Sequence, residues 1–369
     1  MHRWISPPTL AIASLVCGCS SIIEYGGPDG GGPGQVVIPA GPWINATSNL
    51  AGMPSECGNL TSLSVRPDRD SLIAGIAQRG LWVSNDGSTS FTQLGQSSGS
   101  AVIVNRPTAL VFDPDQLGTF YESGIYNGAA VYKTSDQGAT FAPVGSTTHC
   151  DLVSIDFSDP ARRTLLAGGH ESGQRLLYST DSGQNWTDIG KQFPATAGNT
   201  TFPLIIDAQT YLVGTWSGSA AGVYRSTDAG RSWNQVSTAG VNSRPLRAID
   251  GAIYWMVEGD RGVIKSDDKG KSWTSVAGPG VVATTEAGLV ELPDGRLVAP
   301  GLGSSTLMIS KDKGANWQKL GPPLPYPPTG VVYSKYRKAF YLWRFDCLSG
   351  PDPVPADAIM SSQFDYQAP

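Results

Sequence analysis

One eight-residue pattern recurs six times and constrains the fold more than any other feature of the sequence. It consists of Ser or Thr, any residue, Asp, any residue, Gly, two further residues and an aromatic residue. Only the first copy departs from it, with Ser88 in place of the glycine. Consecutive copies lie roughly 40 to 50 residues apart, which is the period of a four-stranded propeller blade. The copies span residues 84–91, 134–141, 179–186, 226–233, 266–273 and 310–317.

Each residue type in this pattern suits a tight hairpin. The Asp and the Ser or Thr side chains can bond nearby turn amides, Gly tolerates positive φ, and the final aromatic side chain can enter the core. The six segments resemble the Asp-box of sialidases, sortilin-type receptors, xyloglucanases and the photosystem II assembly factor. This resemblance implies a β-propeller in which the box joins the third and fourth strands of each blade. It specifies no activity, because hydrolases, receptors and assembly factors share the box.

The chain after the sixth copy lacks the motif but predicts one more blade. Residues 330–334, 339–345 and 358–362 have the pattern of three strands, and a fourth is missing at the C-terminus. Residues 43–47 resemble the strand that follows each motif, so we expect them to complete this blade and close the ring. We therefore predict an all-β chain, a seven-bladed β-propeller of four-stranded antiparallel blades with an N-terminal strand closing the last blade. The 45 glycines, 27 prolines and 15% charged residues fit short strands joined by tight turns.

The first 19 residues have the order of a lipoprotein signal peptide. His2 and Arg3 precede an apolar run over residues 10–16, and the following segment resembles a bacterial lipobox in which Cys19 is lipidated. The alternative is an ordinary cleavage site with a chance cysteine. Ser20 after Cys19 favours the outer membrane. We expect a signal peptide over residues 1–19, a flexible tether over 20–40 and the propeller over 41–369, in a protein anchored in the cell envelope or secreted.

Besides the lipidated Cys19, three cysteines remain after this processing, in a compartment that permits disulfides. Cys57 precedes the first blade and Cys347 lies in the last, so closure of the ring makes them neighbours on one face. We expect these two to form a disulfide, which leaves Cys150 free.

Charge limits the possible partners. The formal net charge of -5 and the pI near 5.2 provide no broad basic surface for phosphates, so nucleic acid is not expected. No cofactor is indicated. The predicted partners are a glycan or glycoconjugate and, through Cys19, a membrane, and we expect a monomer.

The predicted fold also indicates where a site should lie. Loops that enter each first strand and leave each second strand surround the mouth of the central channel, opposite the hairpins. Both histidines that survive processing, His149 and His170, fall in such loops of the third unit, and antiparallel pairing brings Asp151 opposite Glu171 there. This cluster could serve as general acid and base or bind a metal. The alternative is two rim histidines bonded to backbone or water.

Arginines of the same loops suggest recognition of an acidic ligand. A guanidinium binds a carboxylate in a bidentate manner, and sialidases hold their acidic sugar with three arginines. Arg106, Arg244 and Arg344 could form such a triad, with Arg247 as a further candidate. The sialidase Arg-Ile-Pro signature is absent, which puts sialidase activity in doubt. The alternative for each arginine is a solvated rim charge or an ion pair between blades.

Carboxylates and aromatic residues complete the candidates. A pair for glycoside hydrolysis could come from several acidic residues, and sequence does not choose between them. Tyr126 and Trp216 could stack on sugar rings. The carboxylate candidates are Glu122, Asp151, Glu171, Glu258 and Asp346, and the sixth unit offers Glu286.

These observations lead to two function hypotheses. The first is a carbohydrate-active enzyme, a glycoside hydrolase, sialidase-like in its acidic-sugar recognition, or a polysaccharide lyase, with its site at the channel mouth. The second is a non-catalytic propeller that binds a glycan or a protein, similar to sortilin-type receptors or assembly factors.

Overall fold

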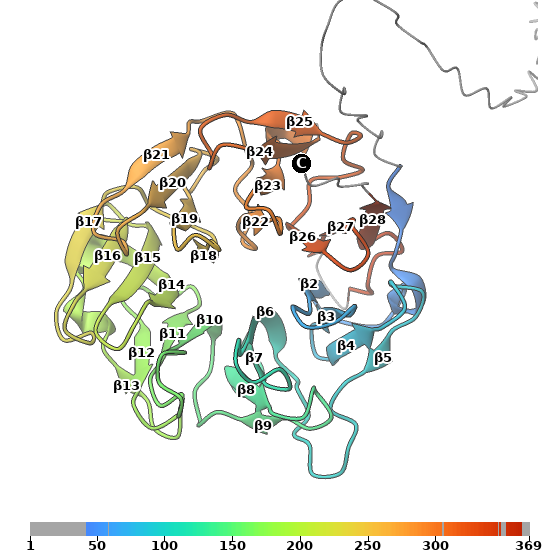
Figure 1. Ribbon diagram of the computed structural model, residues 1–369. Helices are drawn as coiled ribbons and strands as arrows, with labels where there is room; N and C mark the ends of the chain where they lie inside the picture. Colours follow the sequence, from blue (N-terminus) through green and yellow to red (C-terminus); the bar gives the residue numbers. More distant parts are fainter. Residues whose placement is uncertain (1–41, 58, 305, 346, 348–351, 364–369) are drawn as a thin grey trace, which may run out of the picture. The chain divides into compact units, whose positions relative to one another are not determined.

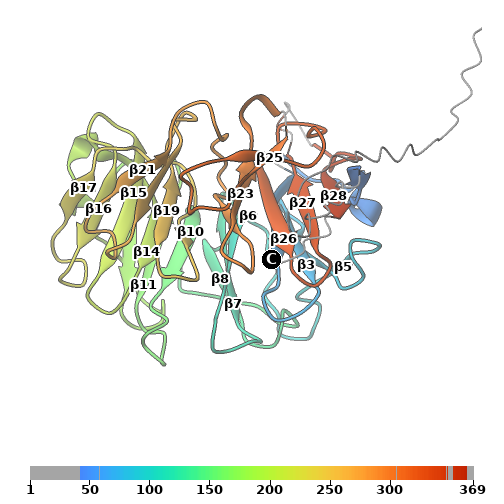
Figure 2. The ribbon, with the colours of Figure 1, turned by 45° about the horizontal axis from the view of Figure 1, so that its top comes forward.

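The computed structural model describes residues 42–57, 59–304, 306–345, 347 and 352–363. These residues form seven four-stranded antiparallel sheets arranged in a ring, which confirms the predicted seven-bladed β-propeller (Figure 1). The first strand of each blade lies nearest the axis, and the strands run between the two faces of the ring (Figure 2). One face carries the motif hairpins and is called the hairpin face here. The rim face is the opposite one, where second strands end and first strands begin.

The first four blades follow chain order. Blade 1 contains β2 (Leu60–Val65), β3 (Leu72–Ile76), β4 (Gly80–Ser84) and β5 (Thr92–Gln93). Blade 2 contains β6 (Arg106–Phe112), β7 (Phe120–Ile125), β8 (Val131–Thr134) and β9 (Ala142–Pro143). Blade 3 contains β10 (Cys150–Ile155), β11 (Leu165–Gly169), β12 (Leu176–Ser179) and β13 (Thr187–Asp188). Blade 4 contains β14 (Gly198–Ile205), β15 (Tyr211–Ser217), β16 (Val223–Ser226) and β17 (Asn234–Ser237).

The last three blades continue the ring back to the N-terminal strand. Blade 5 contains β18 (Leu246–Arg247), β19 (Ile253–Met256), β20 (Val263–Ser266) and β21 (Thr274–Ala277). Blade 6 contains β22 (Val290–Glu291), β23 (Leu297–Pro300), β24 (Leu307–Ser310) and β25 (Gln318–Leu320). Blade 7 contains β26 (Gly330–Ser334), β27 (Ala339–Trp343), β28 (Ile359–Gln363) and β1 (Ile44–Asn45). The helical segments of the described chain are short 3-10 turns: η1 (Ser48–Leu50), η2 (Gly190–Gln192), η3 (Ala195–Ala197) and η4 (Leu302–Ser304).

The N-terminal strand closes the ring, as predicted. In β1, Ile44 pairs with Ser361 and Asn45 with Met360 of β28. Beyond the two-residue strand, the Thr47 hydroxyl accepts a 2.9 Å hydrogen bond from the Ile359 amide. The last blade is therefore built from both ends of the described chain, with β1 as its outermost strand.

The motif hairpins have the hydrogen bonds that their residue types predict. In blade 4, the Ser226 hydroxyl donates to Asp228 and accepts from the Gly230 amide at 2.9 Å, while the Asp228 carboxylate accepts from the Ser232 amide. Gly230 has a φ of 80°, a conformation that favours glycine. The first copy keeps this geometry although it lacks the glycine, because Ser88 adopts a φ of 72°.

Apolar side chains fill the interfaces between neighbouring blades. Strand β3 is buried along its whole length, and its side chains alternate between two neighbours: Leu72 and Ala74 pack toward blade 7, and Ile73 toward blade 2. Charged pairs join blades at the hairpin face, as where Arg162 meets Asp113 at 2.8 Å. Within the described ranges, no helix has the length and apolar character needed to cross a membrane.

Restoring the consensus glycine in the first hairpin should stabilise the protein. Ser88→Gly removes the strain of a left-handed serine, and we expect unfolding to cost about 0.5–1 kcal/mol more free energy in urea titrations. Gly230→Ser is the matched reverse change, because a Cβ there would approach no atom closer than 3.4 Å and only φ is unfavourable. It should destabilise by a similar amount. A less stable Ser88→Gly variant would contradict this account.

Candidate functional site

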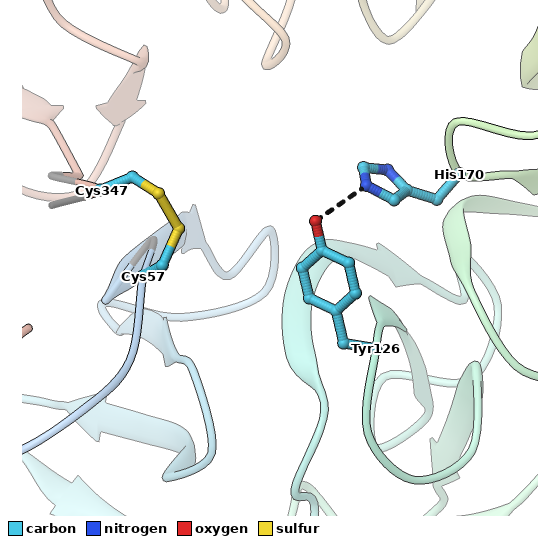
Figure 3. Close-up of a disulfide and its surroundings, with 4 residues drawn as sticks. All are labelled: Cys57, Tyr126, His170 and Cys347. Atoms are coloured by element: carbon cyan, nitrogen blue, oxygen red, sulfur yellow. Dashed lines mark hydrogen bonds between the residues drawn. A yellow bond between two sulfur atoms is a disulfide. The ribbon is translucent and has the colours of Figure 1, made fainter. Parts of the chain in front are cut away.

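The rim face of blades 2 and 3 carries a chain of three hydrogen-bonded side chains, called the relay here. Asp151 lies in β10, His170 directly follows β11, and Tyr126 directly follows β7. His170 Nδ1 lies 3.0 Å from each Asp151 carboxylate oxygen, and His170 Nε2 lies 3.3 Å from the Tyr126 hydroxyl. Figure 3 shows that hydroxyl directed at the His170 ring. The predicted proximity of Asp151 and His170 is present, and Tyr126 joins them. The predicted pairing of Asp151 opposite Glu171 is wrong, because Asp151 is the unpaired residue of a β-bulge.

A β-bulge aims Asp151 at His170. Cys150 pairs with Gly169 and Leu152 with Gly168, so Asp151 is the additional residue between them. First strands β2 and β6 have bulges at the same place, occupied by Thr61 and Thr108. The repeat thus supplies the backbone geometry, and blade 3 places a carboxylate in it.

The relay fixes the tautomer of His170. A carboxylate on Nδ1 can only accept, so Nδ1 carries hydrogen and the Nε2 lone pair of the neutral ring faces Tyr126. The Tyr126 hydroxyl then donates to Nε2. Glu171 Oε2 lies 3.7 Å from the same nitrogen and is largely exposed. This arrangement can accept a proton from Tyr126 and return it.

Charges around His170 favour its protonated form. Burial alone would lower the pKa of the imidazole, but the hydrogen bond and negative charge of Asp151, helped by Glu171, outweigh burial and the opposing charge of Arg106. The pKa of His170 is therefore raised above its usual value. These charges therefore stabilise a proton that the ring takes from a neighbour.

Arg106 lies between two aromatic rings beside the relay. Its guanidinium carbon is 5.7 Å from the centre of the Tyr126 ring and 5.2 Å from that of Phe345, which follows the second strand of blade 7. Its Nε atom is buried, and no hydrogen-bond acceptor for it exists among the described residues. The aromatic faces hold the cation by cation–π contacts and leave its N–H groups unused.

A second guanidinium spans the centre of the ring. Arg244 enters blade 5 and donates to the Thr108 carbonyl of blade 2. Burial lowers the pKa of Arg244 to about 10, against the charges of Glu286 and Asp151. Glu286 remains in contact with solvent, yet the surrounding protein and the negative charge of Asp151 raise the pKa of its carboxyl. These groups form a charged centre next to the relay.

Two of the predicted arginines have other contacts in the structure. Arg344 is ion-paired with Asp357 at 2.6 Å and its guanidinium lies over the Tyr326 ring. Arg247 lies at the end of β18 near the hairpin face, where it contacts the Ile206 carbonyl. Arg344 follows β27 at the rim face, whereas Arg247 ends a first strand and so lies near the hairpin face.

Two predicted carboxylates are also committed to other contacts. Glu122 is fully buried within blade 2 and accepts a 3.2 Å hydrogen bond from the Asn105 side chain. Glu258 accepts from the Ser217 amide and lies 3.8 Å from Arg261. Neither carboxylate has a contact with the relay within the described structure.

The remaining candidates have simpler surroundings. His149 packs edge-on against Tyr126, with ring centres 5.7 Å apart. Trp216 is half-buried at the rim face and donates to the Thr201 hydroxyl at 2.9 Å. Cys57 and Cys347 form a disulfide on the rim face, in view of Tyr126 and His170 (Figure 3). Cys150 is free and buried. Cys19 and Asp346 lie outside the described residues.

Sequence reasoning did not identify Phe345 or Asn105. Phe345 ends the segment expected as a strand of the last blade, and only ring closure brings it to Arg106. Asn105 precedes β6 and donates a hydrogen bond to the buried carboxyl of Glu122, a contact that no periodic pattern in the sequence predicts. Within the described residues, no group of three or more His, Cys, Asp or Glu could hold a metal ion. A hollow of about 480 Å³ on the hairpin face, lined by Asp156, Asp159 and Arg163, contains none of the predicted site residues.

Comparison with known proteins agrees with this fold. No protein-family model matches the chain. A segment of 110 residues is 34% identical to a xyloglucanase of Hypocrea jecorina, covering 29% of this chain and 12% of that protein. The solved GH74 xyloglucanase of Xanthomonas campestris superposes with a TM-score of 0.57 at 18% identity, covering 90% of this chain and 55% of that one. A catalytically inactive histidine-to-alanine variant of Staphylococcus aureus virginiamycin B lyase was solved with quinupristin. It superposes with a TM-score of 0.57 at 11% identity, covering 88% of this chain and 98% of that one.

The chain is thus a seven-bladed β-propeller, and its predicted kinship with propeller proteins is confirmed at the level of fold. It spans about half the length of the solved xyloglucanase and a small fraction of the curated one. The similarity therefore supports the fold alone, and any activity has to be inferred from the residues of the site.

The buried carboxyl of Glu122 should make stability depend on pH. Burial raises its pKa from the ordinary glutamate value of 4.5 to about 8, so between these values the folded state keeps a proton that the unfolded state has lost. Stability then falls as pH rises through this range. Glu122→Gln removes this dependence, and we expect it to be more stable than the wild type by about 2–4 kcal/mol at pH 8 and by little at pH 5.

Urea unfolding at several pH values measures this difference. Glu258→Gln is the control, because that carboxylate is partly exposed and should leave the pH dependence of the wild type intact. Equal slopes for the wild type and Glu122→Gln would show that Glu122 is ionised in the folded protein.

Proposed function

We propose that this chain is an exported carbohydrate-active enzyme that uses the relay for general acid–base catalysis. The observation that carries the proposal is the unbroken hydrogen-bonded sequence from Asp151 through His170 to Tyr126 at the rim face. A carboxylate, an imidazole and a phenol in this order can move a proton to and from the outermost oxygen. A structural role alone would not require a half-exposed tyrosine at its end; Tyr126 is 42% exposed.

The proton path follows from the tautomer. Tyr126 gives its proton to His170 Nε2, and the resulting imidazolium is stabilised by Asp151 on the other nitrogen and by Glu171. The phenolate lies over the Arg106 guanidinium, which favours its negative charge. Tyr126 can then act as a base toward a bound substrate and later return the proton as an acid.

A glycan is the substrate class that the surroundings favour. Xyloglucanases are among the proteins similar to this chain, both in a local sequence match and in fold. The aromatic rings of Tyr126, Phe345 and Trp216 at or near the rim face offer flat apolar surfaces of the kind that stack on sugar rings. The second candidate is a propeller that binds a glycan without turnover, because the same rings and Arg106 could recognise a ligand and do no chemistry.

Substitutions in the relay test catalysis directly. The purified protein is incubated with a panel of neutral and acidic polysaccharides, and new reducing ends are measured. Tyr126→Phe and His170→Ala should lower kcat about 100- to 10,000-fold, since each removes a link in proton transfer. Asp151→Asn should move the acidic limb of the pH–rate profile to lower pH, because it removes the group that most raises the pKa of His170.

Lys271→Ala on the hairpin face is the control and should retain full activity, with thermal midpoints checked for every variant. Turnover unchanged in Tyr126→Phe would exclude the relay as the catalytic device. Binding of a polysaccharide with no cleavage by the folded wild type would favour the second candidate.

We further propose that the protein is anchored in the cell envelope through a lipid on Cys19. This rests on the charged N-terminus, the apolar run and the lipobox-like segment of the sequence. In a bacterial host, the full chain should incorporate labelled palmitate and fractionate with membranes. Cys19→Ala should abolish both, whereas Cys17→Ala should still be lipidated. Labelling that persists in Cys19→Ala would exclude this anchor.

A further inference from the structure

Arg106 differs from the other partly buried arginines of the described residues in the way its charge is held, which is by ring faces alone. Within the described structure, its guanidinium has no hydrogen bond and no ion pair. The other partly buried arginines there each have at least one, as Arg162 does with Asp113. An unpaired guanidinium that has lost part of its hydration is costly unless a ligand supplies the acceptor.

The position of Arg106 fits an anion held next to the relay. Its charge acts on both His170 and Glu286, so it lies close to the reacting groups. Tyr126 and Phe345 clamp the guanidinium, which fixes the direction of its N–H fork. A rigid fork of this kind matches the two oxygens of a carboxylate.

The carboxylates at the site are poorly arranged for hydrolysis by an acid and a nucleophile. Both oxygens of Asp151 lie 3.0 Å from His170 Nδ1, so this group is occupied. Glu286 is the carboxyl of the charged centre, and it lies in the field of Arg244. The third carboxylate, Glu171, is exposed, but it lies 3.7 Å from His170 Nε2, where its charge stabilises the imidazolium. A glycosidase needs one carboxylate free to attack or to activate water. The group best placed to move a proton is instead the Tyr126 hydroxyl.

We propose that the site binds a uronic acid unit of an anionic polysaccharide through Arg106 and cleaves the adjoining glycosidic bond by β-elimination. This inference rests on the proposed acid–base function of the relay. Pairing with Arg106 neutralises the uronate carboxylate, which makes the proton on the neighbouring C5 carbon more acidic. The reaction therefore needs neither a free carboxylate nor a metal ion from the protein.

Tyr126 and His170 account for every proton that moves in the elimination step. Tyr126, as phenolate, takes the C5 proton while His170 holds the phenol proton. The electron pair of the C5–H bond forms the C4–C5 double bond, and the bond from C4 to the glycosidic oxygen breaks. Tyr126 then gives the proton to that leaving oxygen, which becomes a hydroxyl. No water is consumed, and the product carries an unsaturated uronyl end.

The test uses the full protein with polygalacturonate, alginate and hyaluronan as uronate probes and xyloglucan as the neutral probe. At least one uronate polymer should yield products that absorb in the ultraviolet through the new double bond. Their masses should sum to that of the substrate without added water. Arg106→Gln should lower kcat/KM at least 100-fold, and Arg106→Lys should recover only part of it, because lysine restores the charge without the fork.

Arg231→Gln on the hairpin face is the control and should match the wild type. Products that contain added water, or cleavage of xyloglucan alone, would overturn the elimination and leave the proposed carbohydrate activity standing. Full activity in Arg106→Gln would overturn the role of Arg106 and leave the relay standing. A folded protein that cleaves none of the probes or the wider polysaccharide panel would overturn both proposals together.

Discussion

Closure of the ring is the constraint on which the rest of the structure depends. Each blade packs its apolar faces on its two neighbours, so the relative positions of distant blades are fixed mainly when the last meets the first. Two kinds of link do this: strand β1 with the Thr47–Ile359 hydrogen bond, and the disulfide between Cys57 and Cys347. The disulfide lies two residues beyond Phe345, whose ring covers Arg106 of blade 2. Closure therefore completes the site as well as the fold.

The site itself is a variation on repeated backbone geometry. A first-strand bulge recurs in neighbouring blades, and a left-handed residue recurs in the turn after their second strands, including Tyr126 and Glu171. Thr108 uses its bulge to bond the Asp151 carbonyl, which ties blade 2 to blade 3. Asp151 uses the same bulge to hold an imidazole. Function can therefore arise by changing side chains at positions whose conformation the fold already dictates.

The sequence is sufficient for the blades but only partly for the site. Local chemistry at each hairpin, such as the Ser226 and Asp228 bonds, repeats with a fixed period and so reveals blade number and closure. The proximity of Asp151 and His170 also follows from pairing between adjacent strands, but the β-bulge that takes Asp151 away from its expected partner Glu171 does not. Contacts across the ring do not follow. The hydrogen bond from Arg244 to the Thr108 carbonyl forms because the Arg244 side chain points toward the axis, and no periodic pattern in the sequence predicts that direction.

The two guanidiniums near the relay show how the same charge can serve different purposes. Arg244 is enclosed and has a carbonyl partner and two acidic neighbours, so its charge is balanced inside the protein. Arg106 is held by ring faces, which attract the cation without occupying its N–H donors. With a net charge of -5, the protein would repel a polyanion at long range, but salt screens that repulsion beyond about 8–10 Å. Recognition of an anionic chain would therefore depend on one clamped and unpaired arginine.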